Sequence, residues 1–424
     1  MAMQLKPILA SLRHHKLTAL LLMLQVAFSC AIVTNAVFLI VQRVQRVTTP
    51  SGLDERALSL VTVSDLDAGA NPLALHKADL AALRQLPGVE SAALISNVPF
   101  SNSEHGSGGC TSLAAVQAAM KAQSLKVPGC ANADVYSGTP GTLDTLGLKL
   151  VAGRMFNADE YIPGKPPGQS VLVSAMIVTQ GFARRLYPEH PDQAVGRDVY
   201  FDHGLMKGQP TRIVGVVAHL HQANVSGDGN DDRSALLPVE PNEARALFAL
   251  RSTPSQRAGV MKAAVTTLNK RNPGRQVSAD DAQTYAHMRA SYFQGDTTMI
   301  GLLLASALGL LFVTALGIAG LASFWVQQRT RTIGIRRAIG ATRGDILRYF
   351  QTENSLIVGA GVLAGLVLAV ALNLLLMKRY ELPRLPLWYL PLGAFALWAL
   401  GQLAVLAPAL RASRVPPVVA TRSV

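Results

Sequence analysis

The chain contains a single Gly-Lys pair, the residue types that hold phosphates in nucleotide-binding loops. A P-loop needs the pattern G-x-x-x-x-G-K-[ST], in which backbone amides and the lysine bind the phosphates of ATP. Here Gly164-Lys165 is followed by Pro166, and no glycine stands five positions before Gly164. We therefore expect no ATPase site, no catalytic residues and no bound cofactor in this chain.

Two other groups of polar residues have the types that bind metal ions. His219-x-His221 could form a metal site with a carboxylate, but the solvated start of a loop is the favoured interpretation. The run Asp228-Gly-Asn-Asp-Asp232 is similar to a calcium loop but lacks the glycine that such a loop has at its sixth position. A polar turn is favoured there, and we expect no metal centre.

Long uncharged stretches set the fold class. Half of the 424 residues are hydrophobic and 15% are charged, which is too apolar for an ordinary soluble protein. Four stretches without charge exceed the roughly 20 residues that a spanning helix needs. They are 17–41, 298–326, 354–377 and 385–410. We expect an α-helical membrane protein with four transmembrane helices. The first stretch could instead be a cleaved signal peptide, but it is longer than the usual apolar region of one, which favours a retained anchor.

The distribution of Lys and Arg predicts the orientation. These residues gather on the cytoplasmic side of membrane proteins. The segments expected in the cytoplasm are 1–16, 327–353 and 411–424, and those expected outside are 42–297 and 378–384. Lys378, Arg379 and Arg384 in the short outer loop run against the rule. Most of the formal net charge of +13 thus follows from topology, and we expect no nucleic-acid partner.

The outer segment 42–297 reads as an α/β domain with two β-α-β halves and a subdomain inserted at about 145–240. Strand, helix and strand follow one another on both sides of the insert. The first half comprises 58–63, 77–86 and 90–98, and the second 245–250, 255–269 and 275–278. Inside the insert we expect strands at 171–173, 198–201 and 211–217, and a helix at 175–186.

Several runs of residues resemble a known family. The run Arg329-Thr-Arg-Thr-Ile-Gly-Ile-Arg-Arg-Ala-Ile-Gly-Ala-Thr-Arg-Gly-Asp-Ile-Leu347 resembles the cytoplasmic loop of FtsX-like ABC transporter permeases of the MacB class. The ending Pro408-Ala-Leu-Arg-Ala-Ser-Arg-Val-Pro-Pro417 resembles their C-terminal tail. The fragments 145–154, 195–197 and 213–217 resemble their periplasmic core domain. The resemblance covers nearly the whole chain, in order.

The resemblance implies a function and partners. Such permeases sit in the bacterial inner membrane, pair as dimers with a second copy or a sister permease, and bind a separate ATPase subunit that holds ATP and Mg. ATP-driven motion is relayed to the periplasmic domain, a mode called mechanotransmission, and the substrate is moved from the periplasm or outer leaflet, often toward a periplasmic adaptor. Membrane lipid is the remaining partner.

The loop between the second and third spans is the expected ATPase-coupling site. It can form an amphipathic helix with apolar positions among arginines. The alternative to ATPase contact is a basic helix that lies on anionic lipid headgroups. The coupling residues expected are Arg331, Thr332, Ile333, Gly334, Ile335, Arg336, Arg337, Gly340 and Ala341. The family usually has Glu where this chain has Thr332, which favours one member of a heterodimer.

Two of the three cysteines lie in the outer domain. Cys110 and Cys130 fall in a stretch of small residues that interrupts the family-like pattern. Because the periplasm is oxidising, we expect a Cys110–Cys130 disulfide. Cys30 lies in the first span and is expected to be a packing residue.

Three functions remain open from the sequence. The favoured one is an export or extraction permease, with lipoprotein extraction as a variant. The others are a non-transporting regulator of a periplasmic enzyme and a membrane-anchored sensor. A large outer domain favours export over regulation, and the short cytoplasmic segments disfavour a sensor.

Overall fold

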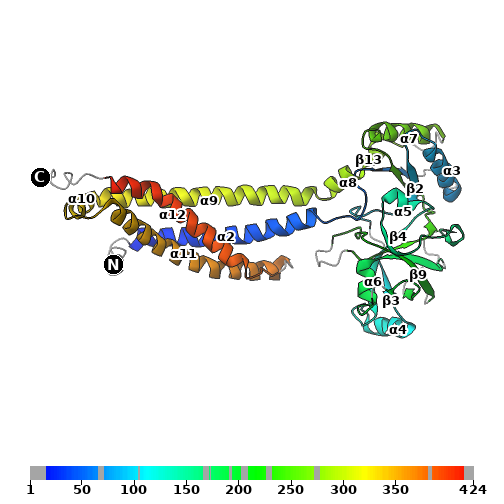
Figure 1. Cartoon of the computed structure of the whole chain (residues 1–424), viewed down its shortest axis with the longest axis horizontal. Coiled ribbons are helices and arrows are strands. Elements are labelled where there is room, and N and C mark those ends of the chain that lie inside the picture. The colour runs from blue at the N-terminus through cyan, green and yellow to red at the C-terminus, as the bar shows by residue number, and fades with distance from the viewer. Residues whose placement is uncertain are drawn as a thin grey trace. The chain divides into compact units, whose positions relative to one another are not determined.

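The computed structural model divides the chain into two compact units (Figure 1). The membrane unit comprises residues up to Val47 and from Gly295 onward, and the α/β domain comprises Thr48–Gln294. The residues described are 16–64, 71–103, 106–165, 171, 173–190, 193–201, 209–225, 232–271, 277–380 and 384–414. The expected segment 1–16 before Lys16, most of the tail 411–424 and most of the polar run 228–232 lie outside them.

Four helices of the membrane unit are long and apolar enough to cross a bilayer. They are α2 Lys16–Val47, α9 Gln294–Gln328, α11 Arg343–Tyr380 and α12 Tyr389–Ser413. The expected four spanning helices are thus confirmed. The last helix begins at Tyr389, not at residue 385. The chain before it is held in a different conformation, in which the Leu385 amide donates to the side-chain oxygen of Asn373.

Helix α11 runs parallel to α2 and packs closely against it. A Cβ on Gly361 would lie 2.9 Å from the Met23 carbonyl oxygen, and one on Gly365 would lie 2.5 Å from Cys30 Cβ. The buried Asn35 amide donates to the Ala369 carbonyl at 3.0 Å, further along both helices. The small-xxx-small spacing of the glycines therefore serves a contact inside this chain.

We predict that Gly365→Ala destabilises the membrane unit by about 1–3 kcal/mol, because an added methyl overpacks the contact with α2. Gly359→Ala is the matched control, since a Cβ there meets nothing within 4 Å. All three tryptophans, Trp325, Trp388 and Trp398, lie in the membrane unit. Thermal unfolding in detergent followed by tryptophan fluorescence therefore reads this unit alone, and equal midpoints for the two variants would contradict the prediction.

The first sheet of the α/β domain has the order β13-β1-β12-β2. Its strands are β1 Leu58–Ser64, β2 Ser91–Ile95, β12 Arg245–Arg251 and β13 Ala282–Thr284, and its helices are α3 Pro72–Arg84 and α7 Arg257–Arg271. Two β-α-β halves are present as expected, and their apolar faces share one core. The last strand is Ala282–Thr284. Residues 275 and 276 of the expected strand 275–278 lie outside the described residues, and the Asn269 side chain bonds both the N–H and the carbonyl of Val277, which is not in a strand.

The second sheet has seven strands in the order β5-β9-β7-β10-β4-β3-β8. They are β3 Gly106–Cys110, β4 Cys130–Ser137, β5 Leu150–Gly153, β7 Ala175–Thr179, β8 Asp198–Phe201, β9 Pro210–Val217 and β10 Ser234–Leu237. The insert therefore starts near Gly106 and not near 145, since β3 and β4 belong to its sheet. Two short strands, β6 Ile162–Pro163 and β11 Val239–Glu240, pair separately.

The interior of the insert differs from the expected order of elements. Residues 175–179 form β7 and not a helix, and the described residues of 171–173 form no strand. All five residues of β7 are buried between β9 and β10, where an apolar run on both faces suits a central strand. The helix α6 Gln180–Leu186 follows β7 directly. Thr179 caps its start, since the Thr179 hydroxyl accepts from the Phe182 amide.

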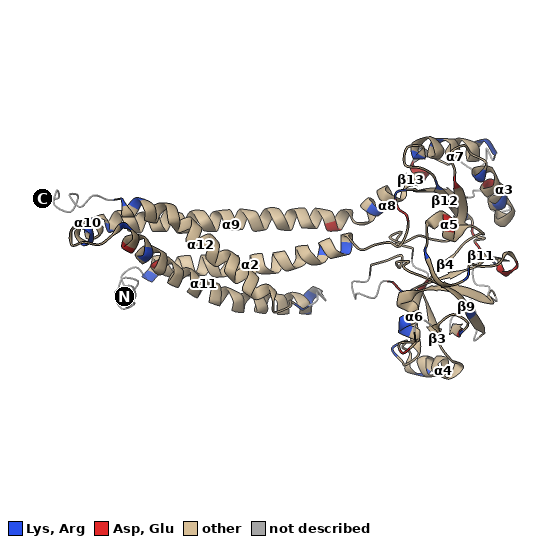
Figure 2. Cartoon of the chain, viewed as in Figure 1, with Lys and Arg blue, Asp and Glu red and all other residues tan. Residues whose placement is uncertain are grey.

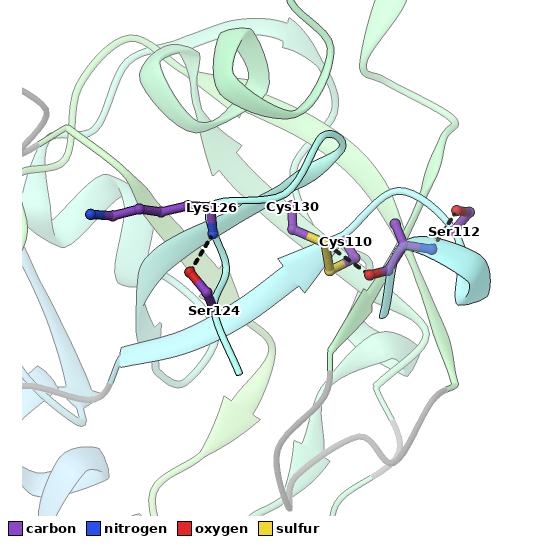
Figure 3. Close-up of a disulfide and its surroundings, with 6 residues drawn as sticks. Cys110, Ser112, Ser124, Lys126 and Cys130 are labelled. Carbon is purple, nitrogen blue, oxygen red and sulfur yellow. Dashed lines mark hydrogen bonds between the residues drawn. A yellow bond between two sulfur atoms is a disulfide. The ribbon is translucent and has the colours of Figure 1, made fainter. Parts of the chain in front are cut away.

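A disulfide joins Cys110 and Cys130, which stand directly opposite each other on β3 and β4 (Figure 3). Helix α4 Leu113–Ala122 lies over it, with Val116 and Ala119 packed on both cysteines. The Ser112 hydroxyl begins this helix by accepting from the Ala115 amide at 3.1 Å. The disulfide thus holds the strands to which a ten-residue helix is attached. The remaining helices of the domain are α5 Thr142–Leu146 and α8 Tyr285–Tyr292.

Candidate coupling site between α9 and α11

A short helix, α10 Thr330–Ala338, connects α9 to α11. Gly340, two residues after the last residue of α10, terminates the helix. Its φ of +105° is a backbone conformation that glycine adopts without strain. The Gly340 amide donates to the Arg337 carbonyl at 3.2 Å, and the Ala341 amide donates to the Arg336 carbonyl at 3.0 Å. This pair of bonds is the Schellman motif, which closes a helix and reverses the chain.

The next residues begin α11. The Thr342 hydroxyl accepts from the Asp345 amide at 3.2 Å, and the Thr342 amide donates to the Asp345 carboxylate at 3.0 Å. This reciprocal cap resembles a capping box.

The expected single amphipathic helix over 329–352 is therefore corrected to two helices joined by a turn at 339–342. The turn places the apolar residues of this segment on two helices, with Ile333 and Ile335 in α10 and Ile346 in α11. Ile333 is 5% exposed and packs with Ile346 and Phe350 of α11 and Ala409 of α12. Gly334 is buried beside it.

The outer face of α10 carries the exposed part of the predicted set. Ile335 is 45% exposed and Ile339 is 82% exposed, one helical turn apart on the same side. The other exposed members are Arg331, Thr332, Arg336 and Gly340, whereas Arg337 and Ala341 are half-buried. We name the exposed pair Ile335 and Ile339, with Arg331 and Arg336 beside it, the α10 surface.

Three residues that support this site, Arg329, Tyr349 and Glu353, were not assigned to it from the sequence. Glu353 of α11 is buried, and both its oxygens accept from the Arg329 guanidinium at 3.0 and 2.8 Å. The Arg336 guanidinium lies 4.8 Å from the centre of the Tyr349 ring. Arg329 thus joins the end of α9 to α11, and Arg336 joins α10 to α11. In the sequence, the one signal for this ion pair was the position of Glu353, directly before the uncharged stretch 354–377.

The histidine pair considered for metal binding does not converge. His219 Nδ1 lies 3.1 Å from an Asp232 carboxylate oxygen, whereas the buried His221 bonds the Gln222 carbonyl and packs on Phe100. Burial raises the pKa of Asp232. Among the described residues, no three His, Cys, Asp or Glu side chains gather as metal ligands would.

Charged residues of the membrane unit lie toward the two ends of its helices, with long uncharged stretches between them (Figure 2). Comparison with known families decides what this arrangement belongs to. The MacB-like periplasmic core domain matches residues 19–278, and the FtsX-like permease C-terminal domain matches residues 304–417. The chain belongs to the FtsX-like permeases of MacB type. These are permeases of ABC transporters, and the two matched domains together cover most of this chain.

Curated relatives are 24% to 30% identical to this permease over the residues that align. The macrolide export ATP-binding/permease protein MacB of Agrobacterium fabrum is 29% identical over 237 residues, which are 54% of this chain and 34% of that protein. The uncharacterized ABC transporter permease YknZ of Bacillus subtilis is 24% identical over 316 residues, covering 69% of this chain and 70% of that protein. The permease spans about a third of the length of the MacB relative.

A solved structure also matches. The periplasmic region of MacB from Actinobacillus actinomycetemcomitans superposes with a TM-score of 0.34 at 10% identity, covering 58% of this chain and 97% of that one.

Proposed function

We propose that this permease relays the motion of a separate ATPase chain, received at the α10 surface, to its α/β domain during export or extraction of a substrate. In this proposal the permease spans the bacterial inner membrane. Both termini and α10 lie in the cytoplasm, and the α/β domain lies in the periplasm. The arginines around α10 support this orientation, since Lys and Arg favour the cytoplasmic side. The Cys110–Cys130 disulfide supports it from the other end, because disulfides persist in the oxidising periplasm.

One observation carries the proposal: the α10 surface exposes two isoleucines on a rigid support. Ile339 is 82% exposed and Ile335 is 45% exposed, whereas Ile333 on the other side of the same helix is 5% exposed. A rigid apolar pair flanked by arginines has the composition of a protein-binding surface. The MacB relative is by its name an ATP-binding/permease protein, which favours an ABC ATPase as the partner.

A second permease is part of the proposal. In the most apolar 18-residue stretch of α9, only 11% of the residues are buried within this chain. Leu302, Leu308 and Phe312 on this helix are all more than half exposed. We propose that a second copy or a sister permease packs near α2 and α9, with Thr332 favouring the sister. A periplasmic adaptor would complete the assembly.

The test is the double variant Ile335→Ser, Ile339→Ser, with the permease purified from its native membranes and co-purifying ABC ATPases identified by peptide mass. Removing two exposed apolar contacts should weaken association at least about tenfold, which corresponds to ~1.4 kcal/mol. The permease separated from the ATPase should hydrolyse no ATP.

The matched control is Leu113→Ser, Met120→Ser. These side chains are 50% and 63% exposed on α4 of the α/β domain, and they should leave ATPase binding unchanged. Full ATPase recovery with the α10 variant, or ATP hydrolysis by ATPase-free permease, would refute the proposal.

A further inference from the structure

The membrane unit carries basic residues at the C-terminal end of α11, and the expected topology does not explain them. Because α11 runs parallel to α2, the C-terminal ends of both helices lie at the same end of the unit. This end carries the cations that run against the positive-inside rule, Lys378 and Arg379 on the last turn of α11 and Arg384 shortly after it. All three are exposed, and none forms an ion pair with another described residue. Glu381, between them in sequence, lies outside the described residues.

The returning chain is fixed beside these cations. The Leu385 amide donates to the side-chain oxygen of Asn373 at 2.9 Å, and both residues are buried. Leu385 packs with Phe38 of α2 and Tyr389 of α12. The cations therefore stand on a rigid junction of three helices.

Two apolar side chains project from the same junction. Leu387 and Trp388 are 68% and 62% exposed. The Trp388 ring stacks on Tyr389 at 3.8 Å between centroids, and Tyr389 meets Phe38 edge to face at 5.4 Å. This ladder of three rings holds the exposed indole in place.

We propose that this junction binds the headgroup of an anionic phospholipid. The three cations attract its phosphates, while Leu387 and the indole of Trp388 enter the interfacial layer where tryptophan prefers to lie. A soluble anion would use the cations and leave the apolar pair exposed to water, whereas a lipid covers both. The site requires only that the helices span a bilayer, so it is independent of the coupling proposed for α10.

The permease offers its own probe. In the variant Trp325→Phe, Trp398→Phe, Trp388 is the remaining tryptophan. This variant is placed in phosphatidylcholine nanodiscs in which about one lipid in five has brominated acyl chains, which quench indole fluorescence. One cation near the surface favours an anionic lipid about fivefold, so the three cations should raise the occupancy of one site from about one fifth to at least one half. Brominated phosphatidylglycerol should thus quench Trp388 at least about 2.5 times as strongly as brominated phosphatidylcholine.

Charge removal at the site should abolish this preference. Adding Lys378→Gln, Arg379→Gln and Arg384→Gln should bring the quenching ratio to about one. The control with equal charge loss is Lys121→Gln, Lys126→Gln and Lys262→Gln on the α/β domain, which should keep the preference. Equal quenching by both lipids, or a preference that survives the triple substitution, would overturn the proposal. So would loss of the preference on adding inorganic phosphate but not sodium chloride of equal ionic strength, because the site would then take free phosphate.

Discussion

Arg329→Met should lower the free energy of unfolding of the membrane unit by about 1.5–3 kcal/mol, because the buried Glu353 carboxylate loses its two hydrogen bonds from the Arg329 guanidinium. The Glu353 side chain is 2% exposed and that of Arg329 is 19% exposed, so water does little to replace the lost charge. Because this pair joins the end of α9 to α11, the loss should also loosen the support of α10.

The second substitution separates charge from shape. Arg329→Met with Glu353→Gln removes both charges and should recover most of the lost stability, since replacing both members of a buried pair is often nearly neutral. Arg343→Met, at the exposed start of α11, is the control and should change stability by less than about 0.5 kcal/mol. Unfolding in detergent followed by tryptophan fluorescence measures all three, and a single variant as stable as the double one would contradict the prediction.

Cys110→Ser, Cys130→Ser should destabilise the α4 region of the α/β domain by about 3 kcal/mol. The disulfide closes a loop of 20 residues, which corresponds to about 3 kcal/mol in the chain-entropy model. The core beneath α4 is small, with Val116 and Ala119 packed on the cysteines themselves. Little other apolar burial is available to hold the helix once the bond is lost.

Hydrogen exchange measures this effect locally. Amides of α4, β3 and β4 should exchange about a hundredfold faster in the double variant, while β1 and β12 in the other sheet should change little. Cys30→Ala is the control, because Cys30 is a free cysteine in α2 and its loss should leave exchange in the α/β domain unchanged. Unchanged exchange in α4 would show that the disulfide contributes no local stability.

Some features could be predicted from the sequence because they depend on composition and local pattern. The four spanning helices follow from uncharged runs longer than a bilayer core, and neighbouring residues cannot override such a run. The two β-α-β halves follow from alternating and helical apolar periods. The strand 198–201 is found at its predicted bounds because its pattern is local.

Other features depend on contacts between residues far apart in the sequence. The strand at 175–179 has helical as well as strand character, and its place between β9 and β10 decides for the strand. The start of the insert near Gly106 is likewise decided by which sheet β3 joins.

At the candidate coupling site, the sequence by itself determined the residues of the loop and their amphipathic character. The tertiary structure alone decided that Ile333 is buried while Ile335 and Ile339 are exposed, and that Arg329 pairs with Glu353. The physical reason is that a pattern along the chain fixes the face of a helix but not what covers that face. Here Gly340 reverses the chain, α11 and α12 cover one side of α10, and the other side stays exposed.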